Sequence, residues 1–213
     1  MPVNVKVCGL TRSEDIATAL ALGVTYGGIN RYDRSPRFVN RVQSRELLEY
    51  LPAGKRVVVD VMPSVPLLAS YKHEGFDFFQ IHFDPDMAAD TIAEWSAEVS
   101  PERLWLAPKL PPEIMQFPRC LLALADTFVI DAFKKDAYGG TGQTADWQRF
   151  NAWQTQYPHK RWILAGGLGP DNVLAAINAT GTEWVDLNSG VESAPGVKDT
   201  GKLGVVIEQI RGL

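Results

Sequence analysis

Cysteine and histidine are scarce in this chain, and their scarcity excludes two kinds of small protein. Only Cys8 and Cys120 occur among 213 residues, too few for a disulfide framework, so a reducing cytoplasm is the expected location. His73, His82 and His159 are scattered and share no metal-ligand spacing with the cysteines. The sequence therefore predicts neither a disulfide scaffold nor a metal site.

Long apolar segments and a strong excess of one charge are also lacking. No apolar run approaches the roughly 18 residues that cross a bilayer, and the start, MPVNVKV, lacks the basic and apolar blocks of a signal peptide. The net charge is −4, with acids and bases interspersed, which argues against nucleic-acid and membrane partners. We expect a protein that acts on a small molecule, either as a monomer or as a homodimer.

Short β-rich runs alternate with helical patterns along the whole chain. Strands are predicted at 3–7, 25–30, 57–61, 76–83, 103–108, 127–132, 161–167 and 183–190. Helices follow them, with Ser13 and Ser44 predicted to cap the first two, and with a poorly formed fifth helix around 112–125. Eight such units favour an α/β fold, a closed parallel (β/α)8 TIM barrel forming one domain over 1–213. An open doubly wound sheet is the alternative.

In such a barrel the active site lies at the carboxyl ends of the strands. Glycine-rich turns, AGGLGPDN and NSGVES, follow the seventh and eighth predicted strands. Backbone N–H groups in turns of this kind are free to bind the oxygens of a phosphate. The glycines are also compatible with merely tight turning between strand and helix, but two such turns in these positions favour a phosphate site.

Cys8 and Asp131 are candidate proton-transfer groups at two strand ends. Cys8 ends the first strand in VKVCGLT, a position where a cysteine is commonly just a buried core residue. Asp131 ends the sixth strand in FVIDAF, where an acid commonly caps a loop or pairs with a lysine. Because the two strands face each other across the barrel mouth, the pair also suits acid–base work on a small ligand. The glycine-rich segment 136–147 is predicted as a lid or as an exposed connection.

These strand ends, in this order, resemble the phosphoribosylanthranilate isomerase family of tryptophan biosynthesis. The motifs are VKVCGLTRSEDI, RSPRFV, FFQIHF, IDAFKKDAYGGTGQTADW, ILAGGLGPDNV and VDLNSGVESAPGVKD, spread over nearly the whole chain. The resemblance implies an isomerase that converts N-(5-phosphoribosyl)anthranilate to 1-(carboxyphenylamino)-1-deoxyribulose 5-phosphate by an Amadori rearrangement. It also implies that the phosphorylated substrate reacts without a cofactor.

The resemblance assigns a role to each strand-end residue. Asp131 would be the general acid that protonates the furanose ring oxygen, and Cys8 the general base that removes the proton from C2′. Arg37, in SPR, would face the anthranilate carboxylate, which a guanidinium fork suits. The remaining implied positions are Gln80 and His82 for the substrate, and Gly166, Gly167, Ser189 and Gly190 for its phosphate.

Three positions depart from the family's pattern, at Arg31, Asp60 and Phe83. Arg31 and Asp60 stand on neighbouring strands with opposite charge, so we predict an ion pair between them near the barrel mouth. The departures leave two alternatives to the implied activity. One is a related sugar-phosphate isomerase whose substrate carries a different amine, and the other is a non-catalytic barrel that binds a phosphorylated ligand.

Overall fold

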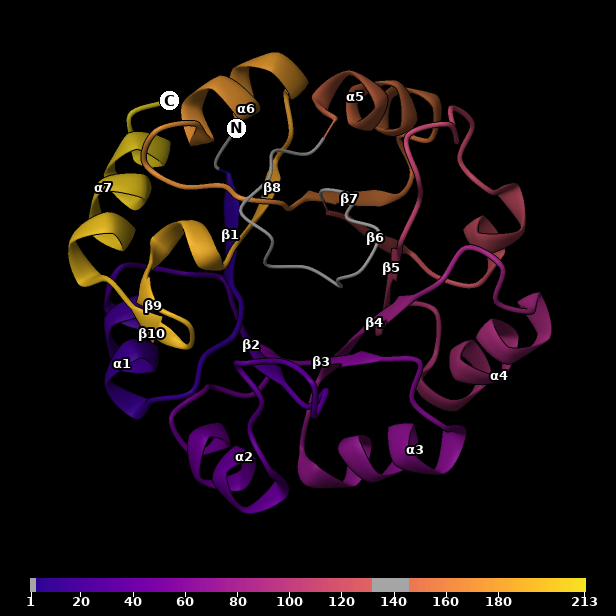
Figure 1. The fold of residues 1–213 in the computed structure, drawn as a ribbon, viewed down its shortest axis with the longest axis horizontal. Coiled ribbons are helices and arrows are strands. Elements are labelled where there is room, and N and C mark those ends of the chain that lie inside the picture. Colours follow the sequence, from indigo (N-terminus) through magenta and orange to yellow (C-terminus); the bar gives the residue numbers. More distant parts are fainter. Residues whose placement is uncertain (1–2, 132–145) are drawn as a thin grey trace.

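The computed structural model describes residues 3–131 and 146–213, and within them eight parallel strands close into a barrel (Figure 1). The strands are β1 (Asn4–Val7), β2 (Tyr26–Asn30), β3 (Arg56–Val61), β4 (Phe78–Phe83), β5 (Leu104–Pro108), β6 (Thr127–Ile130), β7 (Arg161–Leu164) and β8 (Trp184–Leu187). Each strand pairs with the next, and β1 closes the barrel by pairing with β8, with Lys6 opposite Asp186. The predicted barrel is confirmed, and the open sheet is wrong.

Helices form an outer ring around the strands (Figure 1). They are α1 (Ser13–Ala21), α2 (Arg41–Leu48), α3 (Val65–Glu74), α4 (Ala89–Val99), α5 (Trp147–Gln156), α6 (Val173–Thr180) and α7 (Thr200–Arg211). Apolar side chains between this ring and the outer face of the strands form the larger core cluster. In the described part of the chain, no helix is long and apolar enough to cross a membrane.

The predicted caps of the first two helices are wrong. Ser13 is the first helical residue of α1 rather than its cap. The second helix begins before Ser44 because Asn40 caps it, its Oδ1 accepting from the backbone N–H groups of Val42 and Gln43. The Gln43 side chain accepts from the Asn40 N–H in return, which completes a capping box.

The fifth βα unit lacks an α-helix. A 3-10 helix, η1 (Arg119–Ala123), stands in place of the helix predicted over 112–125. Pro111, Pro112 and Pro118 precede it, and proline has no N–H to donate within a helix. The chain between β5 and β6 therefore covers the barrel with a loop and one short turn.

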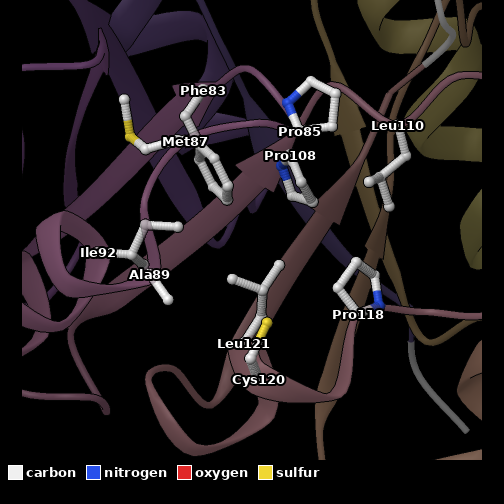
Figure 2. Close-up of a pocket in the computed structure, with 10 residues that line it drawn as sticks. All are labelled: Phe83, Pro85, Met87, Ala89, Ile92, Pro108, Leu110, Pro118, Cys120 and Leu121. Atoms are coloured by element: carbon white, nitrogen blue, oxygen red, sulfur yellow. The ribbon is translucent and has the colours of Figure 1, made fainter.

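A small pocket opens beside η1, between it and α4 (Figure 2). Its lining residues are Phe83, Pro85, Met87, Ala89, Ile92, Pro108, Leu110, Pro118, Cys120 and Leu121. Cys120, which has no predicted role, is exposed at this pocket. None of its lining side chains is charged, and most of them are apolar.

Aromatic rings close the amino-terminal end of the barrel. Tyr26 lies 5.2 Å from Phe78, 5.1 Å from Trp105 and 5.8 Å from Trp184 between ring centroids. Small and β-branched side chains from several strands fill the interior around this aromatic floor. The barrel interior is therefore packed, and its carboxyl end is the end at which such barrels bind ligands.

Candidate active site

Cys8 directly follows β1 and is buried at the carboxyl end of the barrel. Its backbone N–H donates to the carbonyl oxygen of Leu187, which holds it against β8, and its side chain belongs to the interior cluster. Lys6 shares this face of β1. Gly28, on β2, leaves room for both groups: a Cβ there would lie 3.1 Å from Lys6 Nζ and 3.2 Å from Cys8 Cα. The absence of a side chain at Gly28 therefore lets the amine lie beside the cysteine.

Lys6 is one half of a buried ion pair. Its Nζ lies 2.7 Å from Asp186 Oδ2, and the two side chains are only 1% and 6% exposed. Burial works against the lysine's charge, but the attraction of Asp186 and Cys8 outweighs burial, and the pKa of Lys6 is raised. The amine is therefore charged at neutral pH, directly below the thiol.

Burial dominates the proton affinity of Cys8. It raises the pKa of the thiol, because the buried thiolate would lose its solvation. The charges of Lys6 and Lys198 lower the pKa of the thiol, and the charge of Asp186 raises it. Burial is the largest of these effects and prevails. Arg37 is a further cation that interacts with Cys8. The resting group is therefore a thiol at neutral pH.

This protonation state predicts how the reactivity of Cys8 varies with pH. We expect its alkylation rate by iodoacetamide to rise by about tenfold per pH unit through the neutral range, because only the thiolate reacts. The raised pKa means that no plateau occurs below pH 9. The measurement uses a Cys120→Ser protein, so that Cys8 is the one thiol present. A plateau near pH 7 would show that the resting group is a thiolate.

Asp131 directly follows β6 and is half-buried. In the closed barrel, β7 and β8 separate β6 from β1. Asp131 therefore lies at the same end of the barrel as Cys8, but follows a strand on another side of the mouth. Most of the predicted lid or connection, 136–147, lies outside the described residues. Lys134 and Lys135, the lysines nearest to Asp131 in the sequence, also lie outside them.

Gln80 and His82 lie on the inner face of β4, 2% and 9% exposed. Burial, together with a smaller contribution from the charge of Lys6, lowers the pKa of His82 to about 4. The ring is therefore neutral at physiological pH, and its Nε2 lies 3.1 Å from Gln80 Nε2. Because the amide nitrogen can only donate, we assign Nε2 as the acceptor. The pair is polar but uncharged, suited to hydrogen bonding rather than to proton abstraction.

The glycine-rich turns after β7 and β8 touch each other backbone to backbone. Gly166 and Gly167 have φ angles of 96° and 63°, a left-handed conformation that favours glycine. A Cβ on Gly190 would collide with the carbonyl oxygen of Leu168. In the described part of the chain, the buried Ser189 Oγ has no hydrogen-bond partner. The structure thus brings together all four predicted phosphate-site residues.

Asn172 holds the first of these turns in shape. Its Oδ1 accepts from the Gly169 N–H at 2.9 Å, and its Nδ2 donates to the Gly167 carbonyl oxygen at 2.9 Å. We predicted no role for this residue from the sequence. The signal was present, because an asparagine just before a helix commonly bonds to nearby backbone.

Arg37 follows β2 and is bound by Glu192, a residue for which we predicted no role. Glu192 begins β9 (Glu192–Ala194), which pairs with β10 (Val197–Lys198) in an unpredicted hairpin after β8. Its carboxylate accepts from Arg37 Nε at 2.9 and 3.1 Å and from Nη2 at 2.6 Å. Part of the guanidinium fork predicted for a ligand is therefore occupied by the protein itself.

The three positions that depart from the family's pattern all face away from the barrel interior. Arg31 Nη1 lies 2.6 Å from Glu74 Oε2 on α3, and Asp60 accepts a hydrogen bond from Tyr71 on the same helix at 2.6 Å. The predicted ion pair between Arg31 and Asp60 is therefore wrong, because each side chain turns outward to a different partner. Phe83 belongs to the outer core cluster. None of the three changes the lining of the barrel mouth.

A closed parallel barrel with ionisable side chains and glycine-rich turns at the carboxyl ends of its strands is the architecture of a (β/α)8-barrel enzyme. A family described as N-(5'phosphoribosyl)anthranilate (PRA) isomerase matches residues 5–209. The chain belongs to this family of isomerases, which act in tryptophan biosynthesis.

Individual relatives agree with this assignment over almost their full length. The N-(5'-phosphoribosyl)anthranilate isomerase of Zymomonas mobilis is 32% identical over 99% of both chains. That of Paracoccus denitrificans is 36% identical over 95% of this chain and 94% of its own. The solved phosphoribosyl anthranilate isomerase of Thermotoga maritima is 26% identical, with a TM-score of 0.81 over 99% of this chain and all of the other.

Proposed function

We propose that the chain converts N-(5'-phosphoribosyl)anthranilate to 1-(carboxyphenylamino)-1-deoxyribulose 5-phosphate, with Asp131 as general acid and Cys8 as general base. Asp131 donates a proton to the furanose ring oxygen, the C1′–O bond breaks, and the anthranilate nitrogen supplies the electron pair that forms an iminium ion. Cys8 rests as a thiol, and its ionised fraction, the thiolate, then removes the C2′ proton, which gives an enolamine. Protonation at C1′ and loss of the proton from the C2′ hydroxyl give the ketone at C2′.

The observation that carries this proposal is the family match together with the residues that follow β1 and β6. Cys8 and Asp131 are ionisable groups at strand ends, and they suit the two proton transfers. Lys6 supports the thiolate, because its nearby charge favours the ionised form of Cys8. No step requires a cofactor, since the nitrogen of the substrate provides and accepts the electrons.

The two ends of the substrate carry the charges that would bind it. In this proposal the backbone N–H groups around Gly166, Gly167 and Gly190, with the Ser189 hydroxyl, receive the phosphate. The unpartnered Ser189 Oγ supports this, because a buried hydroxyl normally has a hydrogen-bond partner. Arg37 faces the anthranilate carboxylate, and Gln80 and His82 offer uncharged hydrogen-bonding groups to the ribose.

The test is the loss of anthranilate fluorescence when purified protein meets freshly made N-(5'-phosphoribosyl)anthranilate. We expect decay far above the spontaneous rate, and the same decay for a Cys120→Ser control. A matched substrate with aniline in place of anthranilate tests the alternative of a different amine. Turnover of the aniline compound alone would support that alternative. Binding of both compounds without turnover would support the non-catalytic barrel.

The expected cellular setting stays a prediction. We propose a cytoplasmic enzyme with one domain, whose partner is its small phosphorylated substrate rather than nucleic acid or a membrane. Monomer and homodimer both fit. One solved relative, at 25% identity, is the dimeric phosphoribosylanthranilate isomerase of Thermotoga maritima, which has also been converted to monomers.

A further inference from the structure

Glu192 lies at the centre of a buried charge cluster beside the candidate active site. Besides the three bonds from Arg37, its Oε1 accepts from Lys198 Nζ at 2.7 Å and from the Gly196 N–H at 3.2 Å. The side chains of Arg37, Glu192 and Lys198 are 10%, 5% and 2% exposed. A carboxylate with this many donors is held in one orientation, and it holds its partners in return.

The charge of Glu192 is secured by these neighbours. Burial favours the protonated form, but the hydrogen bonds from Arg37 and the charge of Lys198 outweigh it, so the pKa of Glu192 is lowered. Two cations and one carboxylate leave the cluster with one positive charge in excess. A ligand that supplies one further carboxylate would neutralise it.

The position of Arg37 is fixed on a second side by the backbone. Gly9 has a φ of 70°, and a Cβ there would lie 2.6 Å from Arg37 Cδ and 2.8 Å from Asn188 Oδ1. The arginine stem therefore runs directly over the residue that follows Cys8. Within the described residues, the side-chain hydrogen bonds of Arg37 run through Nε and Nη2, so the Nη1 edge of the guanidinium remains to receive a ligand.

We propose that Glu192 is a positioning residue, which acts through Arg37 to orient the free edge of the guanidinium toward the carboxylate of the ligand. The inference rests on the proposed function for the identity of that ligand, an aromatic ring bearing a carboxylate. Glu192 itself does not touch the substrate. It follows Ser189 and Gly190 by only a few residues, so the same loop that offers the phosphate site also supplies the support for the carboxylate site.

The test is Glu192→Gln, which keeps the shape of the side chain and removes its charge. We expect KM for N-(5'-phosphoribosyl)anthranilate to rise by about tenfold to a hundredfold, because breaking a buried charge pair releases the arginine. We expect kcat to change by less than about threefold, because the reacting groups are untouched. A rise in KM confined to this variant, with kcat preserved, separates positioning from a general loss of structure.

A double-substitution cycle shows whether Glu192 acts through Arg37. We expect Arg37→Met/Glu192→Gln to bind no more weakly than Arg37→Met alone, since the two residues form one unit. Additive losses, or an unchanged KM in Glu192→Gln, would overturn the inference. Should Glu192→Gln fail to fold, Glu192→Asp replaces it, since it keeps the charge but draws the guanidinium back, and the same KM rise is expected.

Binding of anthranilate alone, followed by its own fluorescence, separates this inference from the proposed function. We expect the dissociation constant of anthranilate to rise by about tenfold or more in Glu192→Gln. This result would support the role of Glu192 even if the protein did not turn over the phosphoribosyl compound. Equal affinity of wild type and Glu192→Gln for anthranilate would overturn the role, whatever the turnover.

Discussion

Replacing Cys8 by alanine is expected to lower kcat/KM by about a hundredfold or more, because a positioned general base contributes roughly 10²–10⁴-fold. The removed group is a buried thiol at the barrel mouth, and no second thiol lies in the barrel. Cys8→Ser, which keeps a small polar group in the same place, is expected to be nearly as slow, because a hydroxyl is a far poorer proton acceptor at neutral pH than a thiol.

Asp131→Asn tests the other half of the proposed pair in the same fluorescence assay. The amide keeps the size of the carboxyl group but cannot donate the acidic proton, so a loss of similar size is expected. Cys120→Ser is the matched control, since it alters an exposed thiol outside the barrel, and it should keep wild-type rates. Full activity in Cys8→Ala would remove the thiol from the mechanism.

Replacing Lys6 by methionine is expected to destabilise the protein by about 3–5 kcal/mol, because it leaves the buried Asp186 carboxylate without its partner. The free energy of unfolding by urea measures this loss. Replacing both residues, in Lys6→Met/Asp186→Leu, is expected to recover most of the stability, since an apolar pair of similar size needs no counter-ion. A double variant as unstable as the single one would contradict this account.

The loss in Lys6→Met should depend on pH in a defined direction. Burial raises the pKa of Asp186, and the charge of Lys6 opposes that rise, so the variant raises it further. The folded protein is most stable when a carboxyl group with a raised pKa is protonated. The contribution of this group to the free energy of unfolding is lost as the pH rises through that pKa. The stability deficit should therefore shrink as the pH is lowered. A deficit that grows at low pH would show that the ion pair is not its cause.

Lys6→Met also connects stability with reactivity. Because Lys6 lowers the pKa of Cys8, its removal should raise that pKa further and slow the alkylation of Cys8 at a fixed pH. The comparison is made in the Cys120→Ser background without urea, where both proteins are folded. Unchanged alkylation would mean that the charge of Lys6 does not reach the thiol.

The barrel was predictable from the sequence because its signal is repeated. Eight apolar runs at similar spacing favour a closed barrel over an open sheet, and the strand ends then identify the mouth. The candidate phosphate turns were also predictable from the local sequence. Each is a short glycine-rich motif that directly follows a predicted strand, β7 or β8. These features depend on local chain chemistry and on one rule of barrel geometry.

The charge contacts could not be predicted in the same way. Arg37 and Glu192 are 155 positions apart, and β9 and β10 are too short to produce a periodic pattern. Arg31 and Asp60 were paired in our prediction because their strands are neighbours. Both side chains instead point outward to α3, where Arg31 pairs with Glu74 and Asp60 accepts from Tyr71. Contacts of this kind depend on which face a side chain occupies and on which helix covers it.

The aromatic floor of the barrel has a consequence for the kinetics of the enzyme. Tyr26, Phe78, Trp105 and Trp184 seal one end, so a ligand that reaches Cys8 arrives and departs through the same opening. A product molecule must therefore leave through the mouth before the next substrate molecule can enter it.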